Sequence, residues 1–96
     1  MTWWIYIVRV ENGKLYTGIT KDVDARFVAH CEGRGAKFFR SSRPVAVVYR
    51  EGCSDKGTAL SREVAIKRLS KEQKEALILN FSLVPDKPLS STGPQE

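Results

Sequence analysis

Residues 3–20 have the sequence WWIYIVRVENGKLYTGIT, with two apolar runs on either side of Asn12-Gly13. Asn-Gly is the dipeptide that best favours a tight two-residue turn between antiparallel strands. We therefore predict a β-hairpin in which residues 2–10 and 14–19 lie side by side. Everything that follows in the chain has to pack against this hairpin.

The chain is short and basic. Its 96 residues are enough for one small domain, and 16 Lys and Arg against 11 Asp and Glu give a formal net charge of +5. A hydrophobic content of 42% and a charged content of 28% are ordinary for a globular fold, so disorder of the whole chain is excluded. The charge suits a phosphate-rich partner such as nucleic acid, or it serves only solubility.

The sequence predicts no membrane segment. The longest apolar run, Trp3–Val8, is too short to span a bilayer, and no basic segment precedes it as in a signal peptide. Cys31 and Cys53 have no Cys or His neighbours at metal-binding spacing, which favours free thiols over a structural zinc site. We therefore expect a cytoplasmic protein with no membrane association and no obligate protein partner.

Hydrophobic periodicity predicts the remaining elements. A helix capped by Thr20 or Asp22 runs to about Glu32 and ends before two glycines. The further predicted elements are a strand over residues 45–49, a helix over 58–69 and, after a Ser70–Gln73 capping box, a helix to about Asn80. The order β-β-α-β-α-α indicates the α+β class, a small sheet with helices packed on it.

The composition changes from Pro85 on. Proline alternates with serine, threonine and glycine, and few residues are apolar. This composition predicts a folded domain over residues 1–83 and a disordered tail over residues 84–96.

Two tyrosines of the hairpin are candidates for chemistry. Tyr6 and Tyr16 can approach each other across the strand pair. Gly18 indicates a close backbone approach, and such a gap beside a tyrosine can admit a phosphate. Alternatively, both tyrosines are half-buried cross-strand partners, the commoner role for a single tyrosine.

Arg26 and His30 share one face of the predicted helix, because they are four residues apart. A planar, permanently charged guanidinium suits a phosphoryl oxygen, although an isolated arginine is more often a solvated surface residue. A single histidine is likewise more often a packing or capping residue than a catalyst.

Glu63 interrupts the apolar stripe of its predicted helix. It lies four residues after Ala59 and three before Ile66, so its carboxylate is in or beside the buried face. A carboxylate there can hold Mg²⁺ or Mn²⁺, with water and a substrate phosphate completing the shell. An ion pair with Lys67, four residues later, is the equally weighted alternative. Hydrolysis of a phosphodiester with a single metal ion would need the residue types found here, namely two tyrosines, an arginine, a histidine and one carboxylate.

The segment of residues 33–43 combines cations, aromatics and glycines. This mixture favours contact with a nucleic-acid backbone, whereas the two phenylalanines are expected to pack inward rather than stack on bases. The residues expected to contact phosphate are Arg34, Lys37, Arg40 and Arg43, with Lys67 extending the basic surface.

Taken together, these residues resemble the GIY-YIG nuclease domain. Ile5-Tyr6 matches the second and third letters of the first motif, and Tyr16-Thr17-Gly18 matches the second motif. The further matches are Arg26 and His30 at the family's helix positions and Glu63 at its metal-binding glutamate. The likeness covers about residues 2–80 and is greatest to the small single-domain bacterial members. Trp4 in place of glycine, and Thr17 in place of isoleucine, depart from the motifs.

The resemblance implies a metal-dependent endonuclease on a three-stranded antiparallel sheet flanked by helices. Glu63 would bind one Mg²⁺ or Mn²⁺. Tyr6 or Tyr16 would orient or deprotonate the attacking water, and for deprotonation Arg26 or the metal would have to lower the pKa of the tyrosine. Arg26 would stabilise the transition state, and His30 would position a tyrosine or share the proton transfer. Asn80 is the candidate for the family's asparagine near the domain end.

Nucleic acid is the expected partner, DNA in preference to RNA, with low sequence specificity because no recognition element is evident. Two other classes remain open. One is a non-catalytic nucleic-acid-binding module, and the other is a structural interaction domain in which the same residues are core polar groups and ion pairs.

Overall fold

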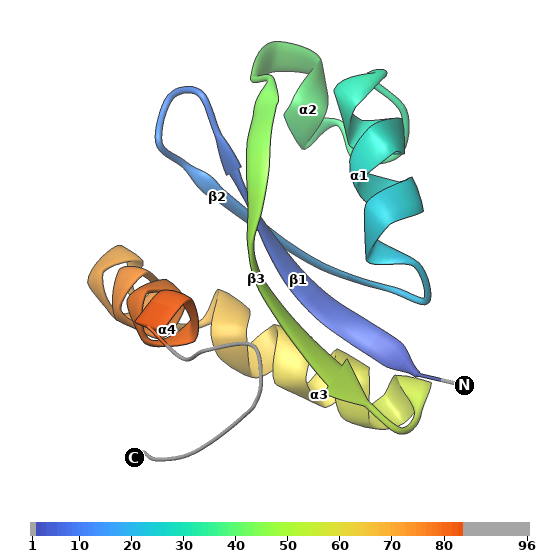
Figure 1. The fold of residues 1–96 in the computed structure, drawn as a ribbon, viewed down its shortest axis with the longest axis vertical. Helices are drawn as coiled ribbons and strands as arrows, with labels where there is room; N and C mark the ends of the chain where they lie inside the picture. The colour runs from blue at the N-terminus through green and yellow to red at the C-terminus, as the bar shows by residue number, and fades with distance from the viewer. Residues whose placement is uncertain (1, 84–96) are drawn as a thin grey trace.

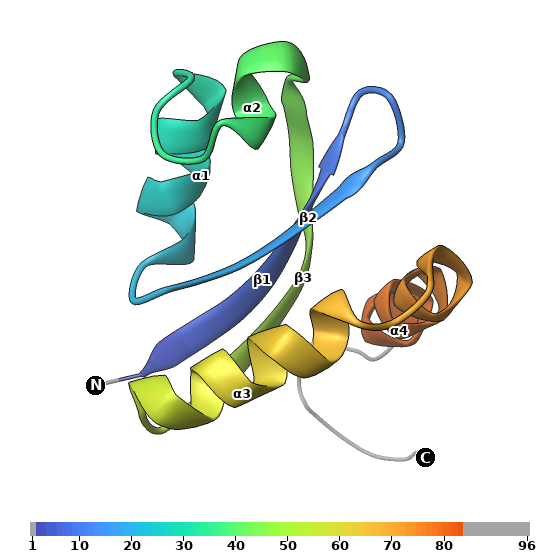
Figure 2. The same ribbon diagram turned by 180° about the vertical axis from the view of Figure 1, so that it is seen from behind.

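The computed structural model describes residues 2–83, which form an antiparallel sheet with helices on both of its faces (Figure 1). The strands are β1 (Trp3–Val10), β2 (Leu15–Thr20) and β3 (Pro44–Cys53), in the spatial order β2-β1-β3. The helices are α1 (Val23–Cys31), α2 (Phe38–Ser41), α3 (Lys56–Lys67) and α4 (Lys71–Leu83). Helices α1 and α2 cover one face and α3 and α4 the other, as Figure 2 shows from behind. The predicted α+β class and three-stranded antiparallel sheet are confirmed.

The element order differs from the prediction by one helix. It is β-β-α-α-β-α-α, because α2 forms inside the basic segment that was expected to be a loop. With four residues α2 is too short to show a helical periodicity in the sequence, and its buried member is Phe39. The predicted tail over residues 84–96 lies outside the described residues.

The hairpin connection has three residues rather than the predicted two. The Val10 N–H donates to the Lys14 carbonyl at 3.1 Å, and the Gly13 N–H donates to the Val10 carbonyl at 2.9 Å. Gly13 has a φ of +87°, a left-handed conformation that glycine adopts without a steric penalty. A tight turn followed by a left-handed glycine is the usual three-residue hairpin loop, so Gly13 acts as the bulge rather than as the turn centre.

Side chains cap three helices, of which the caps of α1 and α4 were predicted and that of α3 was not. Asp22 accepts a backbone N–H of the first turn of α1, and Asp55 does the same for α3. At α4, the Ser70 N–H donates to Gln73 Oε1 at 2.9 Å and the Gln73 N–H donates to Ser70 Oγ at 3.1 Å. This reciprocal pair confirms the predicted capping box.

Strand β3 extends to Cys53, whereas the sequence predicted an end at Tyr49. Residues 50–53 are mostly polar and lie beyond the predicted strand. They nevertheless continue the ladder, pairing with the first half of β1 through partners such as Tyr6–Arg50 and Trp4–Gly52. An edge strand with one solvated face tolerates such polar residues.

The two faces of β1 bury different sets of residues, since successive side chains alternate across a strand. Ile5 and Ile7 pack with Ala59 and Ile66 of α3, and α4 adds Ile78. Tyr6, Val8 and Val10 point to the opposite face, where they pack with Val23 of α1 and Phe39 of α2. The alternation therefore places Tyr6 in the layer of α1 and α2.

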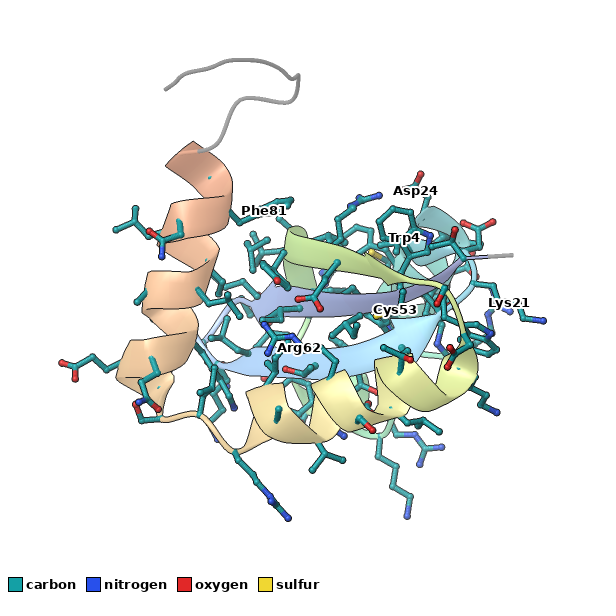
Figure 3. The ribbon with its side chains drawn as sticks, turned by 90° about the horizontal axis from the view of Figure 1, so that it is seen from below. Trp4, Lys21, Asp24, Cys53, Arg62 and Phe81 are labelled. Carbon is teal, nitrogen blue, oxygen red and sulfur yellow. The ribbon has the colours of Figure 1, made fainter. Side chains whose placement is uncertain are left out.

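Helix α3 runs along the sheet and contacts all three strands, whereas α4 stands at one end of it and contacts β3 (Figure 3). Within residues 2–83, no helix is long and apolar enough to cross a membrane.

Candidate active site

Tyr6 and His30 form a buried hydrogen-bonded pair between β1 and α1. The Tyr6 hydroxyl lies 2.9 Å from Nε2 of His30. Tyr6 is 1% exposed and His30 is 0% exposed, so the pair is shielded from water. The other ring nitrogen of His30, Nδ1, has no hydrogen-bond partner among the residues that the structure describes. The pair is the polar centre of an otherwise apolar layer.

Gly18 makes room for Tyr6 rather than for a phosphate. It lies opposite Tyr6 in the strand pairing, and a Cβ at position 18 would come 2.8 Å from the Tyr6 hydroxyl. Because the Tyr6 ring occupies this gap, the expectation that the gap admits a phosphate is wrong. The ring centroids of Tyr6 and Tyr16 are 6.2 Å apart, which confirms the predicted approach of the two tyrosines.

Arg26 lies beside the pair on the same helix as His30. A Cβ at Gly35 would come 3.2 Å from Nη2 of Arg26 and 3.4 Å from Cε1 of His30. Gly35 also has a φ of +94°, so two independent constraints favour glycine there. The turn that follows α1 therefore closes directly over the guanidinium and the imidazole.

Burial sets the protonation states of the pair. Burial raises the pKa of Tyr6 to about 12, the charges of Tyr16 and Glu63 add to the rise, and the guanidinium of Arg26 acts in the opposite direction. Burial and the charge of Arg26 lower the pKa of His30, against a smaller opposing effect of the Arg34 backbone. At neutral pH the phenol therefore keeps its proton and the imidazole is neutral. Arg26 lowers the pKa of Tyr6, the direction that a base role requires, but burial raises it by more.

Glu63 belongs to α3, on the other side of the sheet. Its side chain is 16% exposed, and Nζ of Lys67 lies 3.3 Å from its Oε2. The ion pair that the sequence offered as the alternative role of Glu63 is thus present. Glu63 is also close enough for its charge to contribute to the raised pKa of Tyr6.

The side chains of the site would suit an ion such as Mg²⁺, which needs few protein ligands, and would not suit an ion that must be surrounded by protein side chains. Within residues 2–83, no three His, Cys, Asp or Glu side chains gather where they could hold a metal. One carboxylate is nevertheless a sufficient protein ligand for Mg²⁺, which keeps several waters and binds substrate phosphate. Glu63 could supply that carboxylate through Oε1 while Lys67 stays on Oε2, or through both oxygens after Lys67 is released.

The predicted phosphate-contact residues differ in their environments. Arg34 is ion-paired with Glu32, and Lys67 with Glu63. The side chains of Lys37, Arg40 and Arg43 are exposed and have no ion pair among the described residues. The backbone of Arg43 is tied to Glu11 of the hairpin.

The phenylalanines of the basic segment pack inward, as predicted. Phe39 is 5% exposed and its ring centroid lies 4.8 Å from that of Tyr16, while Phe38 lies 5.5 Å from Tyr16. Phe39 and Gly35 touch the site but were not recognised as site residues from the sequence. The positive φ of Gly35 and the burial of Phe39 depend on tertiary contacts, so the sequence carried no signal for them beyond a glycine near a charged helix end.

Asn80 is not brought to the site. It is exposed on α4, the helix that contacts β3 on the face opposite Tyr6. The structure thus brings Tyr6, Tyr16, Arg26 and His30 together. Glu63 of α3 is near enough for its charge to affect the pKa of Tyr6, and Asn80 lies apart.

The two departures from the motifs have local consequences. Trp4 pairs with Gly52 of β3, and its ring covers that glycine, with Cζ3 3.4 Å from where a Cβ would be. The absence of a side chain at Gly52 therefore accommodates the indole. Thr17 is 4% exposed, and its Oγ1 has no hydrogen-bond partner within residues 2–83.

Known proteins resemble this chain over most of its length. The GIY-YIG catalytic domain matches residues 2–76. A UPF0213 protein of Pseudomonas aeruginosa is 56% identical over 82 residues, which cover 85% of this chain and 79% of the relative. A UPF0213 protein of Desulfotalea psychrophila is 47% identical over 77 residues, covering 79% of this chain and 70% of the relative.

Two solution NMR structures share the fold. The UPF0213 protein of Bacillus halodurans superimposes with a TM-score of 0.56 at 36% identity, covering 86% of this chain and 89% of that one. A protein of E. faecalis superimposes with a TM-score of 0.60 at 25% identity, covering 93% and 95%. The motif residues, their clustering around Tyr6 and these similarities agree, and the chain belongs to the GIY-YIG family, a family of nucleases.

Proposed function

We propose that this protein is a divalent-metal-dependent endonuclease that hydrolyses phosphodiester bonds in nucleic acid, DNA in preference to RNA, with little sequence specificity. One observation carries the proposal. The Tyr6 hydroxyl is held 2.9 Å from a neutral, buried imidazole, with a guanidinium beside them. Membership of a nuclease family supplies the reaction class.

The Tyr6–His30 pair can move one proton. Because His30 is neutral, its Nε2 can accept the phenolic proton, leaving a tyrosinate and an imidazolium. Once substrate binding admits a water beside the Tyr6 hydroxyl, the tyrosinate takes a proton from that water. The resulting hydroxide adds to the phosphorus, the bond from phosphorus to the leaving oxygen breaks, and solvent protonates the leaving oxygen. A pKa of about 12 for Tyr6 means that this transfer needs added positive charge near the phenol oxygen. Among the two tyrosines the geometry favours Tyr6 as the base, because its hydroxyl has a proton acceptor.

Arg26 and Glu63 complete the proposed site. The guanidinium of Arg26 can donate two parallel hydrogen bonds to phosphate oxygens and stabilise the charge that develops on them. Glu63 would hold Mg²⁺ or Mn²⁺ through Oε1, or through both oxygens after Lys67 is released. When bound, the ion neutralises charge on the phosphate and on the leaving oxygen.

The proposed substrate contacts lie on the basic segment. Lys37, Arg40 and Arg43 are exposed and can bind backbone phosphates, with Arg34 and Lys67 contributing once their acidic partners are exchanged for phosphate. Phosphate contacts carry no sequence information, which is why low sequence specificity is part of the proposal. A cytoplasmic location is part of it as well.

A non-catalytic nucleic-acid-binding module is the alternative function. The observation in its favour is the ion pair of Lys67 with Glu63, which engages the acid that would hold the metal. A binding module would use the same basic segment without turnover.

Incubation of the protein with plasmid and with single-stranded DNA and RNA, in Mg²⁺, in Mn²⁺ and in EDTA, separates the two functions. The endonuclease proposal expects cleavage that EDTA abolishes, whereas retention of nucleic acid without cleavage under all these conditions supports the binding module. Tyr6→Phe and Tyr16→Phe form a matched pair, since each removes one hydroxyl from the same cluster. Tyr6→Phe should lose turnover, and Tyr16→Phe should retain the larger part of it; the reverse result would make Tyr16 the base.

A further inference from the structure

Helix α2 places an aromatic ring against His30. The ring centroids of Phe39 and His30 are 4.0 Å apart, and the ring planes are inclined by 27°. Phe39 is buried, although its neighbour Arg40 and nearby Lys37 are exposed. One short helix thus carries cations on its outer side and a ring that covers the imidazole on its inner side.

Phe39 is the nearest ring stacked on the imidazole, since the Tyr6 ring, inclined by 30°, lies 5.9 Å away between centroids. The turn at Gly35 and the backbone of Arg34 also lie close to His30. Its Nε2 bonds to the Tyr6 hydroxyl, and its Nδ1 has no partner among the described residues. Tyr16 meets the ring edge-on, with centroids 5.4 Å apart and planes inclined by 70°. The covalent bond at Cγ and the hydrogen bond at Nε2 fix two ends of the ring, which leaves rotation of its plane about the line between them. A flat ring stacked 4.0 Å away, as Phe39 is, opposes this rotation.

We propose that Phe39 is a positioning residue, which stacks on His30 and so holds Nε2 in line with the Tyr6 hydroxyl while keeping water off the imidazole. This inference rests on the proposed function, because it concerns the same Tyr6–His30 pair. It assigns to a residue of the basic segment a role in proton transfer rather than in contact with nucleic acid.

The groups around His30 show how the ring of Phe39 affects the pKa of the imidazole. The rings of Tyr6 of β1 and Tyr16 of β2 lie beside the imidazole, and Arg26 of α1 is the charged group whose effect lowers the pKa of His30. Burial is the larger cause of the lowered pKa of His30, and the stacked ring of Phe39 contributes to that burial. Opening the imidazole to water should therefore return the pKa of His30 toward its ordinary value of 6.5.

The test uses Phe39→Leu, which keeps an apolar side chain but removes the flat face, and Phe39→Tyr, which restores the face. Phe38→Leu is the matched control, because Phe38 packs on Tyr16 and Phe39 in the same helix. His30 is the single histidine of the chain, so its ring signals can be followed by NMR during a pH titration without ambiguity. In the wild type, the ring protons should show an upfield shift to which the stacked phenyl group contributes. Phe39→Leu should reduce this shift to the part that the Tyr6 and Tyr16 rings cause, and it should raise the pKa of His30. Phe39→Tyr and Phe38→Leu should leave both near the wild-type values.

Cleavage kinetics give the second readout. Phe39→Leu should lower kcat by about 10-fold to 100-fold, the loss typical of a misplaced catalytic group, with KM within about twofold of wild type. The acidic limb of its pH–rate profile should move to higher pH with the pKa of His30, and Phe39→Tyr should rescue both. The titration needs no substrate, so it tests the positioning role even if the wild type cleaves nothing. Absence of the ring-current shift in the wild type, or a Phe39→Leu variant with wild-type titration and wild-type kcat, would overturn the inference. If Phe39→Leu does not fold, Phe39→Met replaces it with the same expected outcomes.

Discussion

Replacement of Thr17 by Val should stabilise the fold. Thr17 lies in β2 with 4% of its surface exposed, and its Oγ1 has no partner among residues 2–83. A buried hydroxyl without a hydrogen bond costs about 1–3 kcal/mol, and valine fills nearly the same shape with a methyl group. We therefore expect the free energy of unfolding to rise by about 1–2 kcal/mol. For a domain of this size each 1 kcal/mol raises Tm by about 4–8 °C.

Thr20→Val, in the same strand, is the matched control. The Thr20 hydroxyl accepts the Asp22 N–H at 3.2 Å and donates to the Asp22 carbonyl at 3.3 Å, so its loss should lower stability by about 0.5–1.5 kcal/mol. Urea unfolding followed by tryptophan fluorescence measures both variants, with an unchanged m-value as the sign that stability alone has changed. A destabilised Thr17→Val variant would refute the reasoning, since it would mean that the Thr17 hydroxyl has a partner in solution.

Three further predictions concern charge. Glu63→Gln should abolish cleavage while thermal stability and DNA affinity stay at least at wild-type levels, because an amide oxygen is a poor ligand for a hard dication; wild-type cleavage by this variant would remove Glu63 from the metal role. A Lys37→Ala, Arg40→Ala double variant should weaken binding to unrelated duplexes equally and reduce the slope of log affinity against log salt by up to about 2, whereas an unchanged slope would show that these side chains touch no phosphate. Arg9, 2.7 Å from Glu75, holds the pKa of that carboxyl down to about 2, so the pair stabilises the fold above the ordinary carboxyl pKa of 4.5 and loses its effect as the pH falls toward 2. Glu75→Gln should therefore lower the free energy of unfolding by about 1 kcal/mol at pH 7, a value kept small by the partial exposure of the pair. The difference in this free energy between variant and wild type should vanish by about pH 2. A difference that does not change with pH would indicate lost packing instead.

The sequence predicted the fold where local patterns and tertiary contacts agree. The apolar runs around Asn12-Gly13 made a hairpin, and the Ser70–Gln73 box began α4 as expected. The prediction failed where tertiary contacts decide. Residues 50–53 lie beyond the predicted strand, yet they pair with β1. Helix α2 was not predicted, and its buried residue is Phe39. Neither effect has a periodicity that a sequence pattern can reveal.

The site could be predicted by residue type but not by its contacts. Tyr6, Arg26 and His30 were expected in one place, and they meet there. The resemblance implied that His30 acts on a tyrosine, but not that the tyrosine is Tyr6, and the stacking of Phe39 on the imidazole was not expected. They depend on the angle between α1 and the sheet and on the path of the segment after α1, which no short motif encodes.

The proposed proton-transfer pair and the proposed metal-binding carboxylate come from opposite layers of the molecule. His30 belongs to α1 on one face of the sheet, and Glu63 belongs to α3 on the other, as the two ribbon views show for their helices (Figures 1 and 2). Side chains from opposite layers can serve one phosphate only at an edge of the sheet, because a central strand would separate them. Strand β2 is such an edge, and Gly18 within it leaves the space that the Tyr6 hydroxyl occupies. The glycine of the second motif therefore brings the phenol to the edge where a residue of α3 can act with it.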